Sequence, residues 1–149
     1  NLATRKAKAY EIENMYVGVT GALSRQDDRY HTVPYRYGFL LSSDRTTGSR
    51  WAMFDHMTRT AKFFSLGPQV SLAEMCFVPR HKGAAEGDGY LIGVASHPRE
   101  GGRSDLVLVD TAHLEDGPVA TVKMPYRIAG QIHGFWVPGD QLPPEPTSI

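Results

Sequence analysis

Short apolar segments separated by glycine, proline and polar turns dominate the chain and predict β-strands. Seven segments have this pattern: 35–41, 51–55, 60–66, 74–79, 89–95, 105–110 and 119–124. Helical periodicity is weak, because the 15 glycines and 10 prolines interrupt any long helical stretch. The pattern therefore predicts an all-β protein.

The last four segments are joined by loops of hairpin length, so we expect one four-stranded antiparallel sheet, the unit that a β-propeller repeats around its axis. The first three predict three strands of a preceding sheet. Segment 89–95 is continuously apolar, as in a strand buried on both faces. Segment 119–124 alternates, as in a strand with one face in water. A β-sandwich has a similar succession of strands, so the pattern leaves both architectures open.

Composition excludes several classes of protein. The 149 residues include 16 Lys+Arg and 16 Asp+Glu, and this zero net charge argues against a nucleic-acid partner. No apolar run is long enough to span a bilayer. The single cysteine, Cys76, cannot form an internal disulfide, which favours a reducing, cytoplasmic location. The chain starts at Asn1 without an initiator methionine, and we expect it to be part of a larger protein.

His133 is the most distinctive histidine. Small residues flank it and an aromatic, apolar run follows it, so it reads as a histidine in an apolar strand. Such a residue is either a hydrogen-bonded core histidine or a ligand. The other five histidines lie in loops or beside turn residues, and we expect them to be solvated: His31, His56, His81, His97 and His113.

Glu74 is the second distinctive residue, because it opens an apolar segment. It is either exposed at a strand end or buried with a partner, since a buried carboxylate without a partner loses its charge. A buried Glu74 would accept a hydrogen bond from a metal-bound imidazole and fix the tautomer of that ring. About one propeller blade and a long loop separate Glu74 from His133, and inner strands of successive blades converge on the axis. One histidine cannot hold a metal, so further ligands must come from chain outside this sequence.

Six motifs occur in order along the chain: Asp27–Tyr30 with Pro34–Gly38, Ala73–Arg80, Gly87–Leu91, Ser104–Asp110, Gly117–Ala120 and Ile132–Pro138. In that order they resemble the C-terminal part of the carotenoid cleavage oxygenases, and most closely the bacterial lignostilbene dioxygenases. The resemblance covers nearly the whole chain from about Gly21 onward.

This resemblance implies a seven-bladed β-propeller with iron(II) on its axis, of which residues 1–149 form about two C-terminal blades within a single dioxygenase domain. In the family, four histidines bind the iron and glutamates orient three of them. By position, His133 matches the last iron-binding histidine and Glu74 the last orienting glutamate. The other three histidines and the residues that recognise the substrate would lie upstream. No residue of this chain is expected to act directly on the substrate.

The implied function is an iron(II)-dependent dioxygenase that cleaves the central C=C bond of a lignostilbene-type stilbene with O2, giving two aromatic aldehydes. Its partners would be O2, a small aromatic or hydrophobic alkene and the upstream remainder of the polypeptide, while the sequence leaves a homo-oligomer open. The family usually has Glu-Phe-Pro-Arg where this chain has Ala22–Arg25, so Ala22 stands in place of an orienting glutamate. The alternatives are an apocarotenoid-cleaving oxygenase and, because of Ala22, a non-catalytic propeller relative.

Two blades alone leave sheet faces and an edge uncovered. We therefore predict that the isolated 149-residue chain is inactive, binds iron weakly and folds poorly or aggregates. Metal analysis and thermal unfolding followed by circular dichroism test this, with the full-length protein as the control. A sharp, cooperative unfolding transition of the isolated chain would contradict the prediction.

Overall fold

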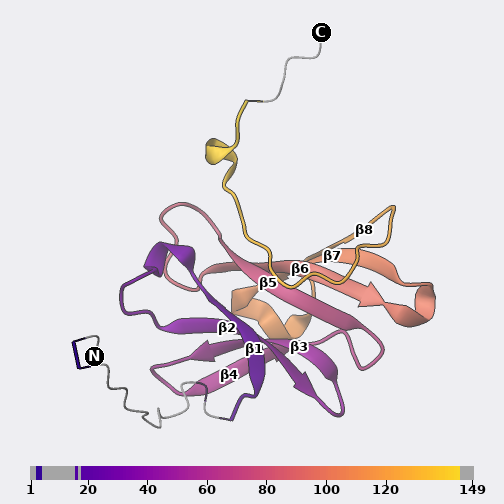
Figure 1. Ribbon diagram of the computed structural model, residues 1–149, viewed down its shortest axis with the longest axis horizontal. Coiled ribbons are helices and arrows are strands. Elements are labelled where there is room, and N and C mark those ends of the chain that lie inside the picture. The colour runs from indigo at the N-terminus through magenta and orange to yellow at the C-terminus, as the bar shows by residue number, and fades with distance from the viewer. Residues whose placement is uncertain (1–2, 5–15, 17, 145–149) are drawn as a thin grey trace.

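The computed structural model describes residues 3–4, 16 and 18–144. In this part, eight strands form two antiparallel sheets (Figure 1). The first sheet contains β1 (Gly21–Gln26), β2 (Tyr37–Asp44), β3 (Gly48–Asp55) and β4 (Thr60–Phe64). The second contains β5 (Ser71–Pro79), β6 (Gly89–His97), β7 (Arg103–Asp110) and β8 (Ala120–Lys123). Short 3-10 helices complete the described elements: η1 (Asp28–Tyr30), η2 (Pro98–Glu100), η3 (Thr111–Asp116) and η4 (Gly139–Gln141).

The order of the strands distinguishes propeller blades from a sandwich. In both sheets, strands that are consecutive in the sequence are also neighbours in the sheet, in the orders β1-β2-β3-β4 and β5-β6-β7-β8. A sandwich of the immunoglobulin type connects its two sheets by Greek-key crossovers. Each sheet here is instead a four-stranded antiparallel meander, as in a propeller blade. The prediction of an all-β chain with about two blades is confirmed. Among the described helices, none has the length and apolar character needed to cross a bilayer.

Strand β1 was absent from the sequence prediction, which gave three strands in the first sheet. Its sequence, Gly-Ala-Leu-Ser-Arg-Gln, contains no β-branched or aromatic residue and so carries little strand signal. It nevertheless pairs with β2, with a bulge between Ala22 and Arg25. Within the bulge, Leu23 has φ of 51°, in the left-handed region where a leucine is strained. Pairing with β2 therefore overrides the weak local preference.

Strand β8 also differs from its prediction. The alternation in 119–124 predicted one buried face, but all four residues of β8 are exposed. The strand lies at the edge of its sheet and pairs only with β7. Val122, which the alternation would bury, is 55% exposed. The apolar side of this edge strand is thus open to solvent in the described structure.

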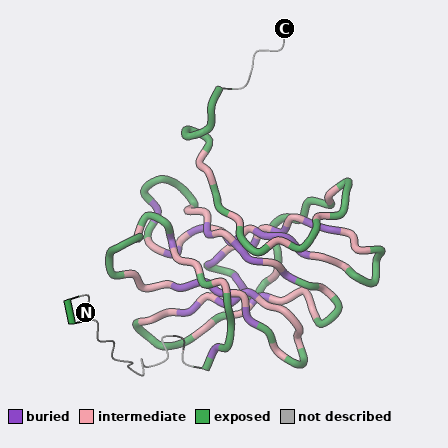
Figure 2. Tube along the Cα trace, in the orientation of Figure 1, coloured by how far each residue is buried: buried purple, intermediate pink, exposed green. Residues whose placement is uncertain are grey.

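The main hydrophobic core lies between the two sheets, along the buried central stretches in Figure 2. Phe39 of the first sheet stacks on Phe77 of the second, with ring centroids 5.0 Å apart. Trp51 of β3 is fully buried, and its Nε1–H donates a hydrogen bond to the carbonyl oxygen of Ala73 in β5 at 2.8 Å. This bond between the sheets fixes the backbone of β5 immediately before Glu74.

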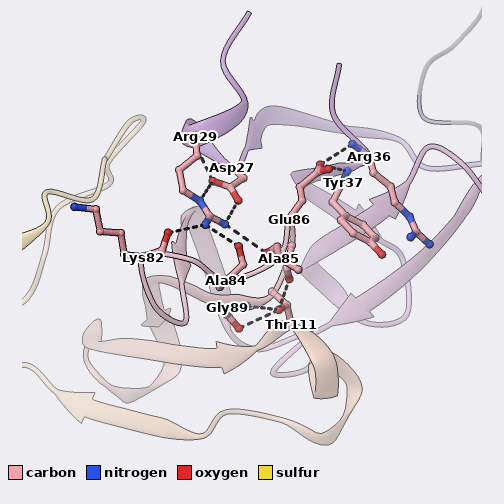
Figure 3. A network of polar contacts seen from close by, with 11 residues as sticks. Asp27, Arg29, Arg36, Tyr37, Lys82, Ala84, Ala85, Glu86, Gly89 and Thr111 are labelled. Atoms are coloured by element: carbon pink, nitrogen blue, oxygen red, sulfur yellow. Dashed lines mark hydrogen bonds and ion pairs between the residues drawn. The ribbon is translucent and has the colours of Figure 1, made fainter. Parts of the chain in front are cut away.

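A polar network also joins the sheets, through the loop between β5 and β6 (Figure 3). Buried Asp27 accepts a 2.9 Å hydrogen bond from Nε of Arg29, whose Nη1 donates to the carbonyl oxygen of Ala84 at 2.9 Å. Glu86 in the same loop accepts hydrogen bonds from the backbone N–H groups of residues 36 and 37, at 2.6 and 2.9 Å. With the core, these bonds make the two sheets one unit in which β1 lies against β5.

The packing between the sheets leaves no space for a side chain at Gly93 of β6. A Cβ atom there would lie 2.6 Å from Cζ2 of Trp51 and 2.8 Å from the backbone oxygen of Glu74, and neither group has room to move. Gly93→Ala should therefore lower the unfolding free energy of the full-length protein by about 1–3 kcal/mol, measured in urea. Gly130→Ala is the control, since nothing lies within 4 Å of its new Cβ. Equal stability of the two variants would contradict this packing.

Candidate metal centre

Glu74 lies inside β5, which begins three residues earlier at Ser71. Between Leu72 and Met75, β5 has one residue more than its partner β6, which makes a β-bulge. Bulges redirect side chains and are frequent beside functional sites. The Glu74 side chain is only 2% exposed. Of the two alternatives considered for Glu74, the exposed strand end is therefore wrong and the buried carboxylate is correct.

Arg25 of β1 provides the opposite charge. Its Nε lies 3.0 Å from Oε1 of Glu74 and its Nη2 lies 2.8 Å from Oε2, so the guanidinium binds both carboxylate oxygens. Nη2 also donates to the backbone carbonyl of Gly134. Sequence reasoning missed Arg25, because the strand that carries it was not predicted. The available signal was the need of a buried carboxylate for a cation.

His133 and Gly134 reach the same carboxylate from the C-terminal segment, which turns back across the second sheet after β8 (Figure 1). Nδ1 of His133 lies 3.3 Å from Oε1 of Glu74, although 59 positions separate the two residues. The N–H of Gly134 donates to Oε2 at 2.9 Å. The structure thus brings the two predicted site residues together.

This contact fixes which ring nitrogen carries a proton. A carboxylate only accepts hydrogen bonds, so Nδ1 of His133 is the donor, and in the neutral ring the lone pair is then on Nε2. The His133 side chain is 70% exposed, and among the described residues none forms a hydrogen bond with Nε2. Glu74 thereby selects the tautomer whose open nitrogen is Nε2, which is the nitrogen that a metal ion would bind. The residues present fit one imidazole ligand.

The charge of Glu74 is set by its hydrogen bonds. Burial alone would raise its pKa, but hydrogen bonds from Arg25, from the N–H of Gly134 and from His133 outweigh burial and lower the pKa of Glu74 below its ordinary value of 4.5. The hydrogen bond to Glu74 in turn raises the pKa of Arg25. Glu74 is therefore an anion at neutral pH, as its contact with the Nδ1–H group requires.

The described part of the chain contains no group of three His, Cys, Asp or Glu side chains close enough to hold a metal. Three of the other histidines are exposed as predicted: His31, His81 and His113. The prediction is wrong for His56 and His97, which are half-buried. His56 packs edge-on against Phe54, and Nε2 of His97 lies 2.9 Å from the buried carboxylate of Asp105. Apolar and ionic neighbours on the sheets, which local sequence does not reveal, account for both.

The segment around His133 is irregular rather than a strand. Gly130, Gly134 and Pro138 interrupt strand pairing, and the N–H of Gly134 binds a side chain instead of a neighbouring strand. The aromatic run after His133 is exposed, with Phe135 at 77% and Trp136 at 43%. The histidine is therefore held by Glu74 and Arg25 rather than by a sheet.

The registers of β1 and β5 locate the counterpart of Glu74 in the first sheet. The bulge of β1 ends at Arg25 and that of β5 ends at Met75, each with one extra residue. Glu74 precedes Met75, and the residue that precedes Arg25 is Ser24. Sheet register thus makes Ser24 the equivalent of Glu74 in the first sheet, whereas the family motif points to Ala22, which is exposed. Neither residue has a carboxylate, so this position of the first sheet lacks the orienting group in either alignment.

Comparison with known proteins finds one family across most of the chain. The family model described as retinal pigment epithelial membrane protein (RPE65) matches residues 1–138. Lignostilbene-α,β-dioxygenase isozyme III of Sphingomonas paucimobilis is 37% identical over 132 residues, which cover 80% of this chain and 27% of that protein. Isoeugenol monooxygenase of Pseudomonas nitroreducens is 50% identical over 72 residues, 48% of this chain and 15% of that protein.

Solved structures agree with these sequence matches. The crystal structure of lignostilbene dioxygenase from Pseudomonas brassicacearum superposes with a TM-score of 0.76 and 28% identity, over 81% of this chain and 28% of that one. The chain thus spans about a quarter of the length of these two lignostilbene dioxygenases.

The ion pair at Glu74 should make stability depend on pH. Because its pKa is lower in the folded protein than its ordinary 4.5, the stabilisation is fully present above pH 4.5 and is lost as the pH falls through the folded-state value. Glu74→Gln should cost about 1.5–3 kcal/mol of unfolding free energy at pH 7 in the full-length protein, and less at pH 3.

Urea unfolding of the wild type and Glu74→Gln across this pH range measures the difference. Glu115→Gln, at an exposed glutamate of η3, is the control and should change the unfolding free energy by less than about 0.5 kcal/mol at pH 7. A cost for Glu74→Gln that stays constant down to pH 3 would contradict the ionised state assigned to Glu74.

Proposed function

Since the chain belongs to the retinal pigment epithelial membrane protein family (RPE65), the carotenoid cleavage oxygenase family that its motifs resemble, we propose that it is the C-terminal part of a non-haem iron(II) dioxygenase. The enzyme would cleave the central C=C bond of a lignostilbene-type stilbene. In this reaction one C=C bond breaks, both atoms of O2 enter the products as carbonyl oxygens, and two aromatic aldehydes form. The proposal includes the cytoplasmic location that the single Cys76 favours.

The observation that carries the proposal is the contact between His133 and Glu74. Nδ1 of His133 lies 3.3 Å from the buried carboxylate, and Nε2 faces away from it without a partner among the described residues. Neutral imidazole nitrogen is a suitable ligand for ferrous iron. His133 would hold the metal through Nε2, and Glu74 would maintain the ring's tautomer and direction. Bound iron would supply the open coordination positions at which O2 is activated.

The remaining ligands must come from elsewhere, because the described part of the chain has no group of three His, Cys, Asp or Glu side chains that could hold a metal. We assign them to the portion of the protein that its relatives have and this chain does not span. In a propeller, inner strands of all blades face one axis, so ligands far apart in sequence can meet there. The exposed ring of His133, at 70%, has the access that such a shared site needs.

The names of the relatives favour a stilbene or a similar phenolic alkene as the substrate. Two of them are a lignostilbene dioxygenase and an isoeugenol monooxygenase, matched at 37% and 50% identity. An apocarotenoid is the other substrate class considered. The two are separated by incubating the full-length protein with each alkene and identifying the aldehyde products by mass spectrometry.

A non-catalytic propeller relative is the second candidate function. It is favoured by one observation, the absence of a carboxylate at both Ala22 and Ser24. Loss of an orienting carboxylate commonly lowers metal affinity or activity about 10- to 100-fold. This candidate predicts a folded full-length protein with little iron, whereas the dioxygenase proposal predicts about one iron per polypeptide chain.

His133→Ala in the full-length protein tests the proposed role directly. We expect the variant to lose most of its iron, measured by elemental analysis, and its alkene cleavage, because one imidazole ligand is removed. His113→Ala is the matched control, since His113 is an exposed histidine of η3 whose ring contacts Asp116, at 3.4 Å, instead of Glu74. Normal iron content and turnover in His133→Ala would disprove the assignment.

A further inference from the structure

Arg25 connects three segments that are distant in the sequence. It extends from β1 in the first sheet, it binds Glu74 of β5 in the second, and it donates to the carbonyl of Gly134 in the C-terminal segment. Its side chain is 26% exposed and the carboxylate that it binds is 2% exposed. Arg25 is therefore a largely buried side chain that joins the buried carboxylate of Glu74 to the backbone of the C-terminal segment.

The bonds around Gly134 form a closed ring. Nη2 of Arg25 donates both to Oε2 of Glu74 and to the carbonyl of Gly134, while the N–H of Gly134 donates to the same Oε2. The residue after His133 is thus bound through both its N–H and its C=O. His133 itself is bound through Nδ1 to Oε1 of Glu74. Backbone and ring of this segment are fixed by one carboxylate and one guanidinium.

The geometry requires a guanidinium rather than a positive charge alone. Nε and Nη2 occupy the two carboxylate oxygens at 3.0 and 2.8 Å, and Nη2 has a second hydrogen for Gly134. A lysine ammonium is a compact point charge and cannot present this planar pair of donors. Arginine therefore holds the plane of the Glu74 carboxylate, and that plane determines where Oε1 meets the imidazole.

We propose that Arg25 is a positioning residue of the metal centre: by binding Glu74 and Gly134 together, it fixes the direction in which Nε2 of His133 points. This inference rests on the proposed function for the identity of the metal, but the positioning itself concerns residues of this chain. It also explains how an irregular, exposed segment holds one imidazole in place. β1 then contributes to the centre through Arg25, although it has no carboxylate at Ala22 or Ser24.

Arg25→Lys in the full-length protein tests the inference by two measurements. The first is anaerobic titration with ferrous iron alone, for which we expect an affinity about 10-fold lower than that of the wild type. The second is the tautomer of His133 in the metal-free protein, read from its ¹⁵N chemical shifts. We expect one tautomer, protonated at Nδ1, in the wild type and a mixture in the variant.

Arg36→Lys is the matched control. Arg36 also forms an arginine–carboxylate pair, with Nη2 at 2.6 Å from Asp55, but it lies outside the metal centre. It should leave both iron affinity and the His133 tautomer unchanged. If Arg25→Lys fails to fold, Arg25→Gln takes its place with the same two measurements, because glutamine keeps an amide donor.

Wild-type iron affinity together with a single His133 tautomer in the Arg25 variant would overturn the inference. Its failure is distinct from failure of the proposed function. If the wild type and His133→Ala bind iron equally, the assignment of His133 as a ligand is wrong. The tautomer measurement, made without metal, then still reports whether Arg25 positions the imidazole.

Discussion

The site depends on a single buried negative charge. Glu74 is 2% exposed and must be surrounded by hydrogen-bond donors to remain ionised. The donors come from β1, from the C-terminal segment and from His133, so one carboxylate couples the two sheets to a segment that has no sheet of its own. The orientation of His133 follows from this arrangement, since the donors leave Oε1 facing the imidazole.

Contacts in the core also set the position of Glu74, independently of these donors. The bulge in β5 turns the side chain away from the ladder, and the bond from Trp51 to the carbonyl of Ala73 holds the backbone just before it. Gly93 on the neighbouring strand leaves space for both the indole and the β5 backbone. Core packing between the sheets and geometry at the candidate metal centre are therefore parts of one structure. A substitution at Trp51 would therefore shift the backbone at Glu74, although Trp51 itself is not part of the candidate metal centre.

The sequence predicted what depends on local pattern. Seven strands were recognisable from apolar runs and turn residues, and their hairpin spacing gave one four-stranded sheet and three strands of the other. β1 was missed because Gly21–Gln26 owes its strand conformation to pairing with β2 rather than to its own residues. The meeting of Glu74 and His133 could be predicted, since about one blade and a long loop separate them and the family resemblance pairs a glutamate with a histidine at these positions. Arg25 could not, because it lies on the strand that was missed and its bonds to Glu74 and Gly134 join residues far apart in the sequence.

Stability of the fold alone does not explain why an ion pair, rather than an apolar pair, stands at Arg25 and Glu74. Removing two charges from water costs free energy that their attraction often only offsets, so a well-packed apolar pair would serve the fold as well. The pair here also leaves an imidazole ring 70% exposed, with no hydrogen-bond partner for its second nitrogen among the described residues. A device that only joined two sheets would have no need to expose and orient a histidine. The same charges acquire a purpose when Nε2 of His133 has a metal to bind, and this is the physical reason for treating Arg25, Glu74 and His133 as one functional unit.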